Sequence, residues 1–221
     1  MTASIPRHQF YGRRKGKPLR RQHSGLMESL LPQLAIDLSQ PLAGTGQRRW
    51  LEIGFGGGEH LAHQAVLHPD VSLIGAEAFQ NGVAKLLAHL AENNVANVRV
   101  HYGDARELLE ALPDSCLERI YLLYPDPWPK ERQKKRRFVN EANLAHFHRV
   151  LQAEGLFHFA SDIPDYVAWT REHISGHVSG RGGFAEEGDP TQPYANWTRT
   201  RYEAKAIREG RVPTYLTFRK V

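Results

Sequence analysis

Between residues 48 and 174, short apolar runs alternate with segments of helical spacing, and this alternation constrains the fold more than any other feature. The apolar runs predict strands at 48–55, 71–78, 98–105, 118–125 and 155–162. The intervening and following segments predict helices at 56–69, 81–94, 106–112, 138–151 and 166–174. Such alternation is typical of an α/β, Rossmann-like fold, a mostly parallel sheet with helices on both faces that binds ligands at the carboxyl ends of its strands.

Segments on either side complete a single expected domain over residues 24–221. Upstream, Ser24 is placed to cap a helix over 24–36 that Pro32 breaks or kinks, and a loop follows at 39–47. Downstream, residues 180–197 are rich in Gly and Pro and predict mostly loop around one short strand. Residues 198–210 predict a helix, and residues 213–220 predict a last strand that runs antiparallel at the sheet edge.

The first 23 residues form a separate, basic segment. They contain no acidic residue, and their polar composition predicts a flexible N-terminal arm. The arm loosely resembles a mitochondrial transit peptide, but Gly12, Gly16 and Pro18 interrupt any amphipathic helix there.

The charge and cysteine content narrow the partners and the compartment. A formal net charge of +5 and a pI near 9.4 favour a polyanionic partner without requiring one. The single cysteine, Cys116, excludes an internal disulfide and fits a reducing compartment, so we expect a cytoplasmic protein. No apolar run approaches the roughly 18 residues of a membrane span. We also expect no metal, because the histidines lack the carboxylate or cysteine partners of a metal site.

The first predicted strand ends in the glycine-rich turn LEIGFGGGEH, which would let a ligand approach the backbone closely. Gly54 and Gly56 match the first two glycines of a dinucleotide fingerprint, but Glu59 occupies the third position. A carboxylate there would repel a pyrophosphate. The alternative is that the glycines only serve the turn.

Acidic residues recur at the ends of the predicted strands. Glu52 lies on the first strand, and Glu77, Asp104 and Asp126 follow the second, third and fourth. Each acid alone could simply cap the next helix. Four carboxylates at one sheet edge, however, suit a ligand with ribose hydroxyls, an amine and positive charge, and S-adenosylmethionine has all three. We therefore expect S-adenosylmethionine as cofactor.

The stretch YPDPWPKERQKKRR (124–137) joins a proline-rich corner to a block of Lys and Arg. Proline fixes φ and removes a backbone donor, so we expect the stretch to be neither helix nor inner strand. Pro125 and Pro127 would hold the Asp126 carboxylate rigidly at the end of the fourth strand. Trp128 is either a buried anchor or a surface on which an unstacked base can stack.

Five motifs together resemble the bacterial tRNA (guanine-N7)-methyltransferase family over residues 7–221. They are PLRRQ, LEIGFGGGEHL, GAEAF with GVAKLL, YPDPWPKERQKKRRF and TRYEAKAIREG. The glycine turn alone indicates only a class I methyltransferase, and the proline corner joined to the basic block is far more specific. The resemblance implies the class I methyltransferase fold with a seven-stranded sheet. It also implies methyl transfer from S-adenosylmethionine to N7 of a guanosine in tRNA, the variable-loop guanosine at tRNA position 46.

The resemblance also implies roles for individual residues. Asp126 would be the catalytic residue and also contact the cofactor, together with Glu52, Gly54, Gly56, Glu77 and Asp104. The substrate nucleotide would be contacted by Lys130, Asp162, Thr200, Arg201, Tyr202 and Glu203. Two positions depart from the family pattern: Glu131 stands where lysine is common, and Arg201 stands where lysine is usual. Asp162 is also placed to cap a helix.

Two basic runs are candidates for contact with the RNA backbone, because phosphates dominate nucleic-acid affinity. They comprise Lys134, Lys135, Arg136 and Arg137 after the corner, and Arg13, Arg14, Lys15, Arg20 and Arg21 in the arm. Alternatively, these residues are only solvated charges on the protein surface. If the arm becomes ordered only when RNA binds, its removal should leave the affinity for S-adenosylmethionine unchanged.

Other functions fit parts of this pattern. A class I methyltransferase could instead act on rRNA, DNA or protein, since the corner loosely resembles that of amine methylases. A non-catalytic RNA-binding module is a further alternative, although such a module gains nothing from four carboxylates. The sequence fits either a monomer or a homodimer.

Overall fold

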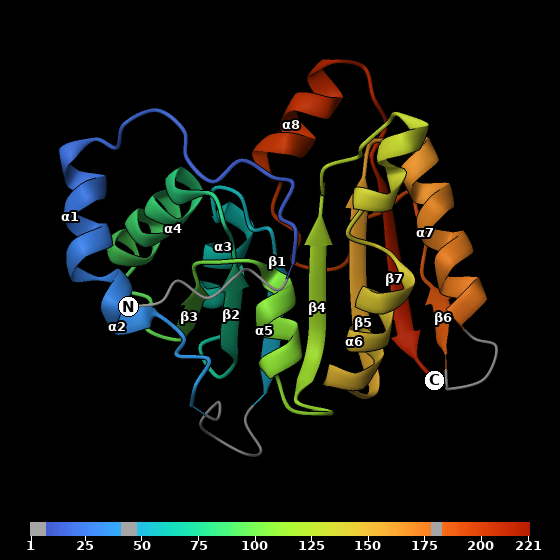
Figure 1. Cartoon of the computed structure of the whole chain (residues 1–221), viewed down its shortest axis with the longest axis horizontal. Helices are drawn as coiled ribbons and strands as arrows, with labels where there is room; N and C mark the ends of the chain where they lie inside the picture. Colours follow the sequence, from blue (N-terminus) through green and yellow to red (C-terminus); the bar gives the residue numbers. More distant parts are fainter. Residues whose placement is uncertain (1–7, 41–47, 178–182) are drawn as a thin grey trace.

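One sheet of seven strands, in the order β3-β2-β1-β4-β5-β7-β6, forms the centre of the molecule (Figure 1). The computed structural model describes residues 8–40, 48–177 and 183–221; the first seven residues of the predicted arm and positions 41–47 of the predicted loop lie outside this range. The strands are β1 (Arg49–Ile53), β2 (Ser72–Ala76), β3 (Val98–His101), β4 (Leu117–Leu123), β5 (Leu151–Ser161), β6 (Phe184–Glu187) and β7 (Thr214–Lys220).

Strands β1 to β5 pair in parallel, and β7 runs antiparallel to β5. The mostly parallel, seven-stranded sheet with an antiparallel last strand is therefore confirmed. The expected edge position of that strand is wrong, because β6 pairs along its outer side from Phe184 opposite Lys220 to Glu187 opposite Thr217. The short strand in the Gly- and Pro-rich segment thus forms this edge of the sheet.

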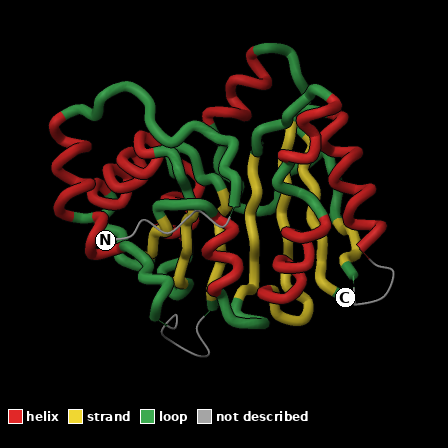
Figure 2. Tube along the Cα trace, viewed as in Figure 1, coloured by secondary structure: helices red, strands yellow, loops and turns green. Residues whose placement is uncertain are grey.

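Helices cover both faces of the sheet (Figure 2). They are α1 (Arg21–Ser29), α2 (Leu31–Leu34), α3 (Glu59–Leu67), α4 (Gln80–Glu92), α5 (Ala105–Ala111), α6 (Glu141–Val150), α7 (Pro164–His177), α8 (Arg201–Arg208) and the 3₁₀ helix η1 (Glu131–Arg136). One apolar core joins the sheet to α5, α6 and α7, and a second joins it to α3 and α4. Successive strand residues point to opposite faces, so Leu51 lies in the first core and Trp50 in the second.

Two local predictions were wrong. The first helix begins at Arg21 rather than after Ser24, which lies inside it. Its expected interruption near Pro32 is present, because α1 ends at Ser29 and α2 begins at Leu31 with Pro32 in its first turn. The basic block forms the 3₁₀ helix η1, although we expected no helix in residues 124–137. The prolines that forbid a helix end at Pro129, so the residues after it are free to make a short helical turn.

Helix α4 touches the glycine turn after β1 at Gly82. A Cβ atom at this position would lie 2.2 Å from the carbonyl oxygen of Gly56, whose own φ is +57°. Only glycine therefore fits between the first turn of α4 and the backbone of the glycine turn.

Replacing Gly82 with alanine should destabilise the protein, although alanine normally favours an exposed helix by about 1 kcal/mol. We expect the clash to outweigh that gain and to lower the melting temperature by a few degrees, about 2–4 °C per kcal/mol for a chain of this size. The matched control is Gly25→Ala in α1, where an added Cβ meets nothing within 4 Å, so its melting temperature should rise. Equal shifts of the two variants would contradict the close approach.

Candidate active site

A cavity of about 520 Å³ opens at the carboxyl ends of the central strands. The glycine turn and the segments after β2, β3 and β4 form its walls, and the N-terminal arm and the start of α8 close it from outside. Its acidic and aromatic lining includes Glu77, Asp104, Asp126, Phe10, Tyr11, Phe79, Tyr124, Trp128, Phe138 and Tyr202. Cavities of this size suit ligands of nucleoside dimensions.

The glycine turn and Glu77 form one wall together. Gly54 and Gly56 have φ values of +67° and +57°, which side-chain-bearing residues rarely adopt. The Gly56 N–H donates to Glu77 Oε2 at 2.8 Å, and the Phe79 N–H donates to Glu77 Oε1 at 2.9 Å. Burial raises the pKa of Glu77, and these backbone hydrogen bonds partly offset that effect. The carboxylate is thereby fixed in the cavity wall.

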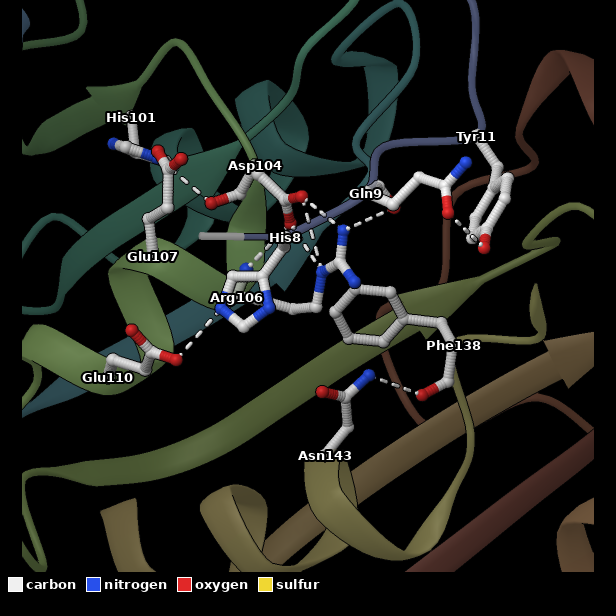
Figure 3. A network of polar contacts seen from close by, with 10 residues as sticks. All are labelled: His8, Gln9, Tyr11, His101, Asp104, Arg106, Glu107, Glu110, Phe138 and Asn143. Atoms are coloured by element: carbon white, nitrogen blue, oxygen red, sulfur yellow. Dashed lines mark hydrogen bonds and ion pairs between the residues drawn. The ribbon is translucent and has the colours of Figure 1, made fainter. Parts of the chain in front are cut away.

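Asp104 and the N-terminal arm meet at the next strand end (Figure 3). Asp104 caps α5 by accepting from the Arg106 N–H at 3.0 Å, and it also pairs with the Arg106 guanidinium. Burial alone would raise the pKa of Asp104, but the hydrogen bonds and charge of Arg106 lower it. Arg106 Nη2 in turn donates to the Gln9 carbonyl at 3.0 Å, and His8 lies 2.8 Å from Glu110. The arm is thus attached to α5.

The proline corner holds Asp126 between two residues with left-handed backbone. Tyr124 has φ +52° and Trp128 has φ +42°, conformations that cost free energy for aromatic residues and concentrate at functional sites. Behind the corner, Arg137 Nε donates to the Pro127 carbonyl at 2.9 Å. Asp126 lines the cavity, and partial desolvation raises the pKa of its carboxyl group. Its position is therefore determined by the backbone on both sides.

Trp128 lies in the cavity wall, outside both apolar cores of the described residues. Its ring meets Tyr11 of the arm edge-on, with ring centroids 6.3 Å apart. The Arg136 guanidinium lies 4.6 Å from the centre of the Tyr11 ring and 5.1 Å from that of Trp128, within cation–π range. This placement favours the interpretation of Trp128 as a stacking surface over that of a core anchor.

The start of α8 covers the glycine turn. Tyr202 lines the cavity and lies directly over Gly56, while Arg201 pairs with Glu59 beside Gly57. Thr200 caps α8 by accepting from the Glu203 N–H at 3.1 Å. Of the four residues predicted here for substrate contact, Tyr202 alone lines the cavity.

Other predicted site residues lie away from the cavity. Glu52 is buried on the α3 face of the sheet, where His60 Nδ1 lies 2.6 Å from Glu52 Oε2. Glu203 is buried and accepts from Trp197 Nε1 at 2.8 Å. Asp162 pairs with Arg211, and Lys130 lies exposed just outside the corner.

The predicted phosphate-contact residues fall into two groups. Arg137 is 1% exposed, and the partly exposed Lys134 pairs at the surface with Glu131 and Asp165, so both already have partners within the protein. Lys135 is exposed at the cavity, and Arg136 is half-buried against Trp128. The basic arm residues Arg13, Arg14, Lys15, Arg20 and Arg21 are all exposed. The burial of Arg137 gives it a structural role at the corner instead of access to a phosphate.

Sequence reasoning missed the aromatic residues of the arm. Phe10 and Tyr11 line the cavity beside Phe79 and Phe138. Their presence as two adjacent aromatic residues in an otherwise polar, basic arm could have indicated a ligand contact. The structure also changes the expectation for removing the arm, because part of the cavity wall would leave with it.

Two kinds of feature are absent from the described part of the chain. No helix there has the length and apolar character needed to cross a membrane. No group of three or more His, Cys, Asp or Glu side chains there is arranged to hold a metal ion.

Comparison with known proteins places these features in a family. The model of a family described as a putative methyltransferase matches residues 47–215. A tRNA (guanine-N(7)-)-methyltransferase of Agrobacterium fabrum is 52% identical, with 95% of this chain and 94% of that protein aligned. One of Rhodospirillum rubrum is 45% identical over 96% of this chain and 88% of that protein.

A solved structure supports the fold independently. The 16S rRNA methyltransferase KamB superimposes with a TM-score of 0.56 at 16% identity, covering 93% of this chain and 97% of that one. At that identity the likeness concerns the fold alone, which is the class I methyltransferase fold. Together with the extensive sequence identity to the named relatives, it shows that the chain belongs to the tRNA (guanine-N7-)-methyltransferase family.

Proposed function

We propose that this protein transfers a methyl group from S-adenosylmethionine to N7 of a guanosine in tRNA. The observation that carries the proposal is the identity of about half of all positions, over nearly the whole chain, to relatives named for this activity. We place the target at the variable-loop guanosine and the protein in the cytoplasm, where tRNA and the reduced Cys116 thiol are both expected.

The cavity fits S-adenosylmethionine in size and in the chemistry of its walls. When bound, S-adenosylmethionine supplies a methyl group on a positively charged sulfonium. We assign Glu77 to ribose hydroxyls, because its carboxylate is held at the strand end about 20 residues after the glycine turn. Asp104 would accept from an amine at the α5 end, and Gly54 and Gly56 would allow close approach of the backbone.

Asp126 would orient the acceptor base and stabilise its charge. Guanine N7 has an in-plane lone pair and no proton, so its reaction needs no general base. The methylated purine is a cation, and a carboxylate held beside it stabilises the charge as it develops. Asp126 can also accept hydrogen bonds from N1–H or the exocyclic amine of guanine, and Trp128 can stack on the base. The left-handed backbone of Tyr124 and Trp128, two residues to either side of Asp126, supports this positioning role.

The tRNA backbone would meet the exposed basic residues around the cavity. Lys130 and Lys135 lie beside the corner, and Arg13 to Lys15 lie in the arm, where Arg13 lines the cavity. Phosphate contacts by such residues make affinity depend strongly on salt.

The proposed activity is tested by incubating the protein with tritiated S-adenosylmethionine and an unmodified tRNA transcript, followed by mapping of the labelled base. We expect label at N7 of the variable-loop guanosine and none in a transcript that carries adenosine there. Label in rRNA, DNA or protein but not in tRNA would overturn the proposal.

Replacing Asp126 with asparagine should lower kcat by about tenfold or more, because a carboxylate that stabilises developing charge is lost. The Kd for S-adenosylmethionine, measured by calorimetry, should change much less than kcat. The matched control is Glu131→Gln, which removes a carboxylate with 86% side-chain exposure outside the cavity and should leave both values near wild type. A variant that loses cofactor binding outright would contradict the assigned role.

Removing residues 1–21 should weaken binding of both ligands. The KM for tRNA should rise because basic residues are lost, and the Kd for S-adenosylmethionine should rise because Phe10 and Tyr11 leave the cavity wall. The double variant Phe10→Ala/Tyr11→Ala keeps every charge and should raise the cofactor Kd by about tenfold or more, given about 0.5–1.5 kcal/mol for each of the two aromatic contacts. Unchanged cofactor affinity in both proteins would show that the arm serves RNA alone.

A further inference from the structure

A buried carboxylate–histidine pair lies behind the cavity, on the face of the sheet that packs against α3. Glu52 is 3% exposed and His60 is 1% exposed, and His60 Nδ1 lies 2.6 Å from Glu52 Oε2. Neither side chain lines the cavity. Burying a carboxylate costs free energy unless it has a fixed partner, and His60 is that partner here.

The other nitrogen of His60 contacts a loop far along the chain. His60 Nε2 is hydrogen-bonded with the Tyr194 hydroxyl. The ionised Glu52 carboxylate can only accept, so His60 Nδ1–H donates to it, and His60 Nε2 shares the second hydrogen bond with the Tyr194 hydroxyl. The Tyr194 ring also packs on Tyr121 and His158, at centroid distances of 5.5 and 4.6 Å. Tyr194 is thereby fixed both by its ring and by its hydroxyl.

The same contacts continue into α8. The Trp197 ring lies 5.6 Å from that of His60, and Trp197 Nε1 donates to Glu203 Oε2 at 2.8 Å. The Tyr215 hydroxyl donates to the second Glu203 oxygen, Oε1, at 2.7 Å. Glu203 directly follows Tyr202, the residue that covers Gly56 at the cavity. A continuous set of buried and partly buried contacts therefore connects Glu52 in β1 with the cavity wall formed by α8.

We propose that Glu52 and His60 are positioning residues, which act through Tyr194, Trp197 and Glu203 to hold the start of α8, with the predicted substrate contact Tyr202, in the cavity wall. This inference rests on the proposed methyl transfer to tRNA for its kinetic consequence only. It differs from the sequence-based assignment of Glu52 to the cofactor, which requires a carboxylate facing the cavity. The Glu52 side chain instead faces α3, because strand residues alternate between the two faces.

The kinetic test compares Glu52→Gln and Tyr194→Phe, each of which keeps the shape of its side chain. Both should raise the KM for tRNA by about fivefold or more, since each weakens or removes a hydrogen bond of His60 that positions α8. The Kd for S-adenosylmethionine should stay within about twofold of wild type. The double variant should be no worse than the more impaired single variant, because both changes interrupt one connection. A large loss of cofactor affinity in Glu52→Gln with normal KM for tRNA would overturn the proposal and restore Glu52 as a cofactor contact.

Hydrogen exchange of the unliganded protein tests the proposal without any activity. Amides of residues 201–208 should exchange about tenfold faster in Tyr194→Phe than in wild type, while those of α5 should keep their rates. Unchanged exchange in α8 would overturn the proposal even if tRNA methylation is confirmed. Faster exchange in α8 in a protein inactive on tRNA would support the connection and refute only the proposed substrate.

Thr170→Val provides the matched control. Thr170 is fully buried in α7 and donates to the Tyr166 carbonyl at 2.8 Å, so this variant removes a buried hydroxyl from the opposite face of the sheet. Its KM for tRNA and its exchange in α8 should equal those of wild type. If Thr170→Val shifts both as much as Tyr194→Phe does, general loss of stability explains the effects and the positioning role is refuted.

Discussion

The site depends on one constraint, the parallel pairing of β1 with β2 on one side and β4 on the other. Because the three strands run in the same direction, the segments that leave their carboxyl ends begin side by side. The glycine turn, Glu77 and the proline corner therefore face a common cavity although they are far apart in sequence. The helices after β1 and β4 lie on opposite faces of the sheet, so a crevice opens between them where a ligand can enter.

The sequence predicted the acids that follow strands better than the acid within a strand. Glu77 comes directly after β2, and Asp104 and Asp126 lie three residues past the ends of β3 and β4. The chain at these points must enter the crevice whichever way the strand is rotated. Glu52 precedes the end of β1, so its direction depends on the pleat. The alternation could not be read from the sequence, because every residue of β1 is buried and both faces of a covered parallel strand are apolar.

Charge alone also failed to distinguish basic residues with different surroundings. Lys135 and Arg137 look equivalent in KKRR, but the turn of η1 exposes the first and buries the second against Pro127 and Asp165. The burial of Arg137 follows from contacts with α7, which starts 27 residues later, and no local pattern records them. The sequence did not predict η1, because the exclusion of helix by the prolines was applied also to the residues after Pro129, where no proline remains.

The attachment of the arm has a consequence for how ligands compete. Residues 10–13 line the cavity, and the Gly16 N–H donates to the Asn81 side chain at 2.9 Å. The chain then enters α1, which packs on α4. Phe10 and Tyr11 are thus tethered a few residues from a fixed point. A segment held on so short a tether has an effective concentration of about millimolar at its own binding site. Any nucleotide that displaces these rings competes with an intramolecular ligand, whose return needs no encounter through solution.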